Sequence, residues 1–272
     1  MRMRRLVAGL VALVMLASTA WAEPLEQELA RVLKVDEVSA ILRDEGVRYG
    51  TELEADMLGG QGGRYFQDRV ATLYDADDMG AALTKTLAQT LDNDEMRAVI
   101  HFFDTKEGQR ILTLENAGRV AMADPAVEDL ARATYRDLVG SDDPHLVAVE
   151  RFVETNDLIE RNVTSGLDSN YHFLRGLVEG GGAKMGEREI ASEVWAQEDE
   201  MRADTTSWIY GFLLMAYQPL TGDTLQSYSD FSASVAGQAL NKALFIGFEQ
   251  IYNEISYELG LAVAQAMNGS DI

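Results

Sequence analysis

The chain has no cysteine and only four prolines among its 272 residues. Without cysteine there is no disulfide, no thiolate metal ligand and no thiol nucleophile, so stability has to come from a packed core. A chain of about 250 residues buries roughly three quarters of the surface that it exposes when unfolded, which is enough for such a core. The scarcity of proline leaves long segments free to form helices.

Positive charge is also scarce, because 23 Lys and Arg residues face 45 Asp and Glu residues and the net charge is −22. Such an excess of carboxylates repels phosphate backbones and anionic lipid headgroups, so we expect no nucleic-acid partner. The simplest interpretation of this acidity is solubility. A sharper one is attraction of cationic partners or divalent ions.

The only long apolar run lies near the N-terminus. Residues 1–22 start with three arginines and no acid, continue with an apolar run over 6–17, and end in an A-x-A site before Glu23. This order is typical of a cleaved secretory signal peptide, whereas a membrane anchor, the alternative, needs about 20 apolar residues. We therefore expect export to the periplasm and a mature chain without a transmembrane segment. Loss of the three arginines would change the net charge from −22 to −25.

One short sequence occurs twice. "FFDTKEGQ" at 102–109 returns as "FSASVAGQ" at 231–238, an offset of 129 residues. At the same offset stand identical pairs, namely Leu91 and Leu220, Asp94 and Asp223, Gly118 and Gly247, Leu130 and Leu259, and Ala133 and Ala262. Earlier residues pair at an offset of 120, as Arg31 with Arg151 and Gly46 with Gly166. Two ordered offsets predict a tandem repeat, with one unit at 23–140 and another at 141–272.

The pattern within each repeat is helical. Alternating apolar and polar runs, which indicate strands, are hard to find, and apolar spacing over 25–33 predicts a short amphipathic helix. Asp36 and Asn156 are expected to cap the helices that follow, and glycine runs at 59–63 and 180–182 are expected to end them. We predict an all-α fold in which the two multi-helix units pack as one pseudo-two-fold body.

The repeated sequence itself is interpreted as a structural motif. Its residues are Phe102, Thr105, Gly108 and Gln109 in the first copy, and Phe231, Ser234, Gly237 and Gln238 in the second. The hydroxyl would cap a new helix, the glycine would admit a neighbouring helix where a Cβ would not fit, and the phenylalanine would anchor the bend in the core. The alternative is a polar site, but these residue types offer no base, acid or strong nucleophile.

This motif resembles DUF2059, a bacterial domain family of unknown function with the pattern Phe-aromatic-x-Ser-Pro-x-Gly. The matching residues are Phe102, Phe103, Thr105 and Gly108 in the first copy, and Phe231, Ser234 and Gly237 in the second. Lys106 and Val235 replace the proline, and Ser232 replaces the second aromatic residue. The resemblance implies two divergent tandem copies of an exported, all-helical domain, and it implies no activity.

No group of residues predicts catalysis, a cofactor or a metal. The three histidines lack metal-ligand spacing, and the glycine runs lack the pattern of a phosphate-binding loop. "YDADDMG" at 74–80 resembles a calcium loop, but Met79 and Thr86 stand where oxygen ligands are needed. We expect this segment to be an acidic helix start and "QEDE" at 197–200 to be a solvated helix face, with weak calcium binding as the alternative for both.

The segment 208–217, "WIYGFLLMAY", is apolar nearly all round and predicts a buried central helix. A sharper interpretation makes Trp208, Phe212 and Met215 the wall of an apolar pocket. The leading functional hypothesis, which rests on the lack of catalytic residues and on the helical repeat, is a non-enzymatic envelope protein that acts through contacts with another protein. The alternative, supported by this segment and the aromatic-rich 245–257, is a carrier or sensor of a small apolar ligand.

Overall fold

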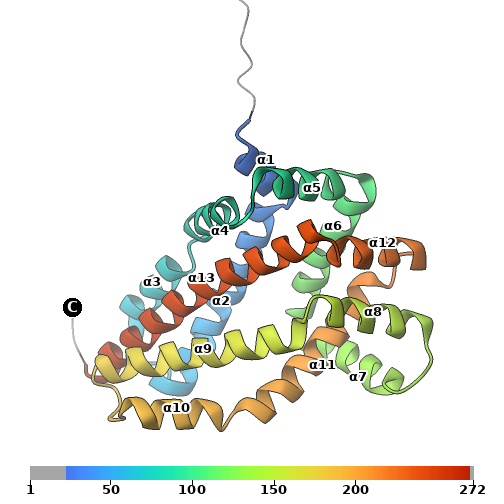
Figure 1. The fold of residues 1–272 in the computed structure, drawn as a ribbon. Helices are drawn as coiled ribbons and strands as arrows, with labels where there is room; N and C mark the ends of the chain where they lie inside the picture. Colours follow the sequence, from blue (N-terminus) through green and yellow to red (C-terminus); the bar gives the residue numbers. More distant parts are fainter. Residues whose placement is uncertain (1–22, 270–272) are drawn as a thin grey trace, which may run out of the picture.

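The computed structural model describes residues 23–269, all of whose regular elements are α-helices (Figure 1). The all-α prediction is confirmed. The predicted signal peptide at 1–22 lies outside the described residues. Within 23–269, no helix combines the length and the apolar character that crossing a membrane requires.

Residues 25–138 are called the first unit. Its helices are α1 (Leu25–Val32), α2 (Val35–Leu58), α3 (Gly63–Leu73), α4 (Ala76–Thr90), α5 (Asn93–Phe103), α6 (Lys106–Met122) and α7 (Pro125–Leu138). The longest of them, α2, ends at Gly59, whose left-handed φ of 57° closes the helix without a side-chain clash. The expected stop at the first glycine run is thus correct.

Residues 144–267 are called the second unit. Its helices are α8 (Pro144–Thr155), α9 (Leu158–Glu179), α10 (Glu187–Trp195), α11 (Glu198–Tyr217), α12 (Gly222–Ser232) and α13 (Val235–Met267). Helices α5 and α12 have the same length and stand 129 residues apart. The span of α6 and α7 together coincides with that of α13 at the same offset.

Near the start of each unit the offset of 120 is wrong. Lys34 and Asp157, the residues before α2 and α9, share a left-handed backbone with φ of 56° and 52°, and they stand 123 residues apart. Asp36 therefore lies inside α2 rather than at its N-cap, and Asn156 is the C-cap of α8. The error of three residues is close to one helical turn, so apolar faces still coincide and the periodicity alone could not reveal it.

The long helix α13 crosses the molecule and lies beside α9 along most of its length (Figure 1). Two glycines permit this approach. A Cβ on Gly260 would lie 2.1 Å from the carbonyl oxygen of Phe173, and a Cβ on Gly176 would lie 2.0 Å from that of Tyr257. The two backbones therefore touch directly, at a distance that no larger residue allows.

Helices of each unit pack against helices of the other unit. Helix α6 of the first unit packs on α11 of the second, and α13 of the second unit packs on α4 of the first. Glycines of the repeat lie at both contacts, since a Cβ on Gly118 would meet Ala216 and a Cβ on Gly247 would meet Leu83. One core cluster consequently combines Val99 of the first unit with Leu240 of the second.

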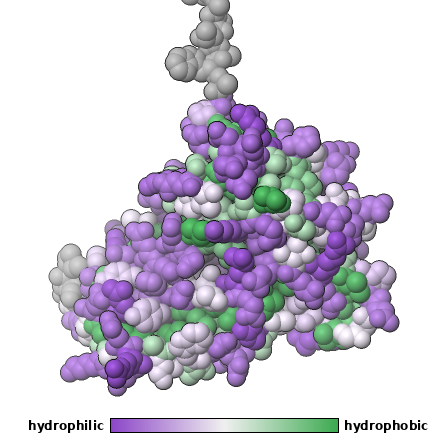
Figure 2. Space-filling model, in the orientation of Figure 1, coloured by the Kyte–Doolittle hydropathy of each residue, from purple (hydrophilic) through white to green (hydrophobic). Residues whose placement is uncertain are grey.

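The molecular surface is largely hydrophilic on the face shown in Figure 2, with smaller hydrophobic areas between the charged residues. This distribution fits the 45 acidic residues of the chain. The apolar side chains of 208–217 are instead directed inward, and Ile209, Leu213, Leu214 and Tyr217 are buried. The expectation of a buried helix in this segment is correct.

Candidate functional site

The repeated motif forms a tight corner between two helices in each unit. Thr105 is the N-cap of α6, and its Oγ1 accepts a hydrogen bond of 3.0 Å from the backbone N–H of Gly108. Ser234 is the N-cap of α13, and its Oγ accepts a bond of 3.1 Å from the N–H of Gly237. Each hydroxyl thus satisfies one of the backbone donors that a helix leaves free at its start.

The glycine of each corner is required by the backbone of the preceding helix. A Cβ on Gly108 would lie 2.5 Å from the carbonyl oxygen of Phe102, at the end of α5. A Cβ on Gly237 would lie 2.1 Å from the carbonyl oxygen of Phe231, at the end of α12. Backbone atoms cannot rotate away as a side chain can, so the angle of the corner depends on glycine.

The glutamine of each corner ties it to the start of its own unit. The Nε2 group of Gln109 donates to the carbonyl oxygens of Val32, at 2.8 Å, and of Phe103, at 3.0 Å. The Nε2 group of Gln238 donates in the same way to Thr155, at 3.0 Å, and Ser232, at 2.8 Å. Both amides therefore satisfy carbonyl groups that helix ends leave free.

The two corners meet at the boundary between the units. The rings of Phe102 and Phe231 stack with centroids 4.1 Å apart and an interplanar angle of 11°. Phe103 meets Phe231 edge to face, with centroids 5.5 Å apart. The motif residues therefore act together as a structural joint, and the Phe231 side also reaches a cavity.

A cavity of about 570 Å³ lies between the two units. Helix α13 contributes the largest apolar part of the lining, Leu240, Leu244, Phe245, Phe248 and Tyr252, together with the polar side chains of Asn241 and Glu249. Glu115 and Arg119 of α6 also line the cavity, and residues of α2, α5, α8, α9, α11 and α12 complete its lining. Both units are thus needed to enclose this space.

The three residues that were expected to form the wall of an apolar pocket do not line this cavity. They are Trp208, Phe212 and Met215, and the rings of Trp208 and Phe212 stack on each other with centroids 5.1 Å apart. Leu213 and Tyr217 of the same helix do line it. Because successive helical residues point about 100° apart, an apolar segment does not reveal which of its faces borders a cavity.

The carboxyl group of Glu115, on α6, is the most unusual polar group in this cavity. The hydroxyl of Tyr217 donates to Oε1 of Glu115 at 2.6 Å, and that of Tyr228 donates to the same oxygen at 3.3 Å. Burial raises the pKa of Glu115 to about 7 from an ordinary 4.5, although both hydrogen bonds act to lower it. Burial and the nearby carboxylate also raise the pKa of both phenols well above 10, so they stay protonated donors.

One turn further along α6, Arg119 is already paired. Its Nε lies 2.9 Å from Oε1 of Glu45 and its Nη2 lies 2.8 Å from Oε2, an ion pair that joins α6 to α2. Burial acts to lower the pKa of Arg119, but the hydrogen bonds and charge of Glu45 outweigh it and raise this pKa. The charge of Arg119 is therefore balanced before any ligand binds.

The contributions of α6 and α13 to the lining differ most where the repeat places corresponding residues. Leu244 and Phe248 of α13 stand 129 residues after Glu115 and Arg119 of α6, and all four line the cavity. At these two positions α6 carries charged, hydrogen-bonding side chains where α13 carries apolar ones. The sequence offered a signal for this site, because at the offset of 129 residues several glycines are identical whereas these two positions change from charged to apolar.

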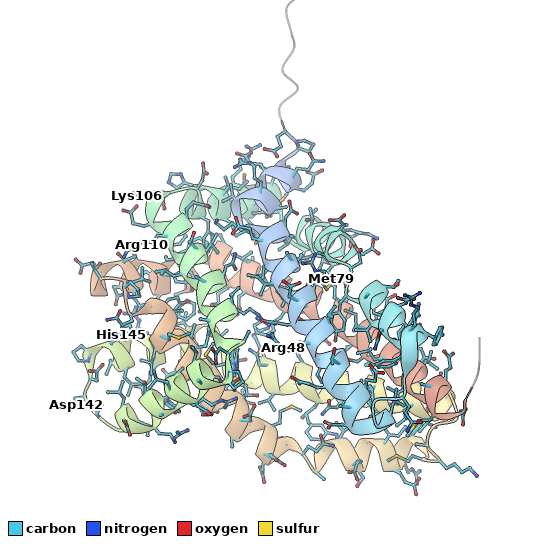
Figure 3. The ribbon with its side chains drawn as sticks, turned by 180° about the vertical axis from the view of Figure 1, so that it is seen from behind. Arg48, Met79, Lys106, Arg110, Asp142 and His145 are labelled. Atoms are coloured by element: carbon cyan, nitrogen blue, oxygen red, sulfur yellow. The ribbon has the colours of Figure 1, made fainter. Side chains whose placement is uncertain are left out.

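The residues of the calcium-like segment at 74–80 and His145 contribute to helix caps and to the core. Asp75 caps α4 through the N–H groups of Asp77 and Asp78, and Met79 is buried in the core (Figure 3). The Nε2 atom of His145, at the start of α8, lies 3.1 Å from the carbonyl oxygen of Leu214 (Figure 3). Within 23–269, no three His, Asp or Glu side chains are grouped as metal ligands.

Comparison with known families identifies one segment. Residues 77–137, which run from α4 to α7, match the family described as "Uncharacterized protein conserved in bacteria (DUF2059)". The resemblance is confirmed as a match over this segment of the first unit, which includes Phe102 and Gly108. The predicted second copy lies outside the matched residues. No curated protein and no solved structure matches the chain.

Proposed function

We propose that the protein is a non-enzymatic binding protein that holds a small, mainly apolar molecule in the cavity between its two units. The observation that supports this function is the cavity itself, with a volume of about 570 Å³ and an apolar wall on α13. Small-molecule sites usually occupy roughly 300–1,000 Å³ and combine apolar linings with a few polar groups that fix orientation. The size and lining of this cavity agree with that description.

The polar groups of the cavity suit recognition better than turnover. The carboxyl group of Glu115 is held by two phenols, and Arg119 is held by Glu45. A polar group that is already hydrogen-bonded in this way can still orient a ligand. A general base, in contrast, has to accept a proton from a nucleophile placed beside it. A carrier or sensor therefore accounts for the arrangement more simply than an enzyme.

We further propose that the second unit is a divergent DUF2059 copy and that binding takes place in the periplasm. The matching corners at Gly108 and Gly237, with their hydroxyl caps, support the duplication. The basic and then apolar order of residues 1–22 supports export. A duplicated unit also explains why the cavity lies between two similar halves.

Native mass spectrometry of protein purified from the periplasm tests the binding function. Wild-type protein should retain a small-molecule adduct, and Ser165→Trp should lose it, because Ser165 lines the cavity and an indole would occupy the space. Thr164→Trp, an exposed position beside it on α9, is the matched control and should keep the adduct. A wild-type protein without adduct, or an adduct that survives in Ser165→Trp, would contradict the proposal.

A second function is supported by one exposed side chain. Trp195, at the end of α10, is 65% exposed, and tryptophan is enriched at protein interfaces. An envelope protein that acts through a protein partner would use such a residue. Crosslinking in living cells should then capture the same partner repeatedly with wild-type protein and lose it with Trp195→Ser; equal capture by both would remove this candidate.

A further inference from the structure

The charges that face the cavity are predominantly negative. Glu115 and Glu249 line it with carboxyl groups, and Arg119 is the lining residue of opposite charge. Because Glu45 already pairs with Arg119 through two hydrogen bonds, that guanidinium has little attraction left for a ligand. An anionic ligand would therefore meet uncompensated carboxylates, in a chain whose net charge is −22.

Aromatic rings surround the carboxyl group of Glu115. Phe152, Tyr217 and Tyr228 all line the cavity, and the ring of Phe152 lies with its centroid 4.6 Å from that of Tyr228 and 5.6 Å from that of Tyr217. Tyr217 and Tyr228 are also the two residues that hydrogen-bond Glu115. Aromatic rings beside an acidic group are a recurrent means of binding organic ammonium ions, since ring faces attract a cation and the carboxylate pairs with it.

Part of the α13 wall of the cavity suits an apolar tail. Leu244, Phe245 and Phe248 line the cavity together with Asn241 and Glu249 of the same helix, and Leu244 and Phe248 stand 129 residues after Glu115 and Arg119. A ligand with uniform character would leave either the polar or the apolar part of the lining unmatched. An amphiphilic ligand can satisfy both, because its head would meet polar groups while its tail removes apolar surface from water.

We propose, on the basis of the binding function above, that the ligand is an organic ammonium ion with an apolar tail. Its cationic head pairs with the Glu115 carboxylate beside the rings of Tyr217 and Tyr228. Its tail lies along the apolar face of α13. The paired Arg119 and the negative charge of the chain select against fatty acids and phosphate esters of similar size.

The protonation of Glu115 predicts a pH dependence of binding that distinguishes a cationic ligand from a neutral one. Its pKa is about 7, so near neutral pH a proton competes with the ammonium head for the same carboxylate. The groups that face it are the phenols of Tyr217 and Tyr228, whose pKa values are raised well above 10, and nearby Arg119 remains charged beside Glu45. Affinity for a cation should therefore rise between pH 6 and pH 8, whereas affinity for a neutral ligand should not.

Three probes with the same eight-carbon tail test the head group: octylammonium, 1-octanol and octanoate. Titration calorimetry with the full-length exported protein should give the tightest binding for octylammonium and the weakest for octanoate. Glu115→Gln should weaken octylammonium binding at least about tenfold, the loss expected for one charge-assisted contact, and should leave 1-octanol binding unchanged. Glu107→Gln removes one negative charge from the exposed start of the same helix and should change neither.

The outcomes separate this inference from the function on which it rests. If 1-octanol or octanoate binds wild-type protein as tightly as octylammonium does, the ammonium assignment is wrong and the binding function survives. If none of the probes binds, the ammonium assignment is also overturned, and the adduct experiment with Ser165→Trp remains the separate test of binding. Should Glu115→Gln fail to fold, the rise in octylammonium affinity between pH 6 and pH 8 on wild-type protein decides, and a flat profile overturns the proposal.

Discussion

Helices α6 and α7 of the first unit and α13 of the second occupy corresponding spans of the chain, 106–138 and 235–267, yet only the second forms one continuous helix. The break in the first unit lies at Asp124 and Pro125, where the Asp124 side chain accepts a bond of 2.9 Å from the N–H of Ala126. Asn253 and Glu254 stand at the corresponding places in α13. Proline at the first position of a helix, after an Asp cap, is a strong start signal, whereas Asn-Glu can continue a helix.

This local difference changes the packing of the two units. After the break, α7 turns and packs against α11, whereas the unbroken α13 continues beside α9. Figure 1 shows α13 extended across the molecule with α9 beside it, and α7 under α8 at the other end. The same corner motif can therefore precede two different arrangements, because an Asp cap followed by proline ends one helix and starts another.

Of the contacts that distinguish the two units, the one between α13 and α9 should lose the most stability on substitution. In Gly260→Val, the new Cβ would lie 2.1 Å from the carbonyl oxygen of Phe173, and neither backbone can yield without separating the helices. We expect a loss of about 3 kcal/mol or more in the free energy of unfolding, measured by urea denaturation. Gly222→Ala, where a Cβ meets nothing within 4 Å, is the control and should cost almost nothing. Equal stability of the two variants would contradict the close approach.

A proline can be introduced into the second unit at the position where the first unit has its helix break. Glu254→Pro places proline inside α13 at the position that corresponds to Pro125, where it removes a helical hydrogen bond and clashes with the preceding turn. We expect a loss of about 3 kcal/mol in the free energy of unfolding. Pro125→Ala should lose less than about 1 kcal/mol, because the N–H at the first helical position has no intrahelical partner. If both substitutions cost the same, the continuity of α13 does not matter for stability.

The polar side of the cavity should make stability depend on pH. The folded pKa of Glu115 is about 7 against an ordinary 4.5, so the folded state binds this proton more tightly. The stabilisation that this bound proton gives the folded state is complete below about pH 4.5. It is lost as the pH rises through 7, which lowers the free energy of unfolding by up to about 3 kcal/mol. Glu115→Gln should remove this part of the pH dependence and should be more stable than wild type at pH 8.

The comparison is made by denaturant unfolding at pH 5 and pH 8. Glu107→Gln, at the exposed start of α6, is the control and should keep the wild-type dependence on pH. A wild-type protein whose stability does not decline relative to Glu115→Gln across this range would show that Glu115 has an ordinary pKa. Leu244, at the corresponding position of α13, has no titratable group and contributes no such dependence.

The smallest loss of stability should come from removing the helix N-cap, a feature that both units have. Thr105→Ala and Ser234→Ala each remove an N-cap hydrogen bond, to Gly108 and Gly237, and each should cost about 1 kcal/mol. Exchange of the two residues, as Thr105→Ser or Ser234→Thr, keeps the hydroxyl and should be nearly neutral. Thermal unfolding followed by circular dichroism measures all four variants. Very different costs for the two alanine variants would mean that the corners are not equivalent.

Sequence patterns predicted the local features well. The all-α class, the short first helix, the stops at glycine runs and the acidic start of α4 at Asp75 each depend on residues close together in the chain. The first-unit resemblance to DUF2059 was also visible from a short motif. Errors appeared where one helical turn separates alternatives, as with Asp36 and Asn156, because apolar periodicity repeats every turn.

The candidate site was predicted only in outline. Trp208, Phe212 and Met215 were the expected wall, but Leu213 and Tyr217 of the same helix face the cavity. Glu115, which the sequence left unremarked, lies against Tyr217 and Tyr228 from positions about a hundred residues away. The sequence shows that a helix is apolar on several faces, but not which neighbour each face meets.

By itself, the sequence determined where helices begin, bend and end, because caps, glycines and proline act through atoms within a few residues of one another. It also determined that the chain contains one motif twice. Tertiary structure alone decided that helices of each unit pack on helices of the other, that Phe102 stacks on Phe231, and that Glu115 and Arg119 of α6 share a cavity with the apolar side chains of α13. These features depend on the relative placement of helices far apart in the chain, which is fixed by side-chain packing across the whole body and not by any local pattern.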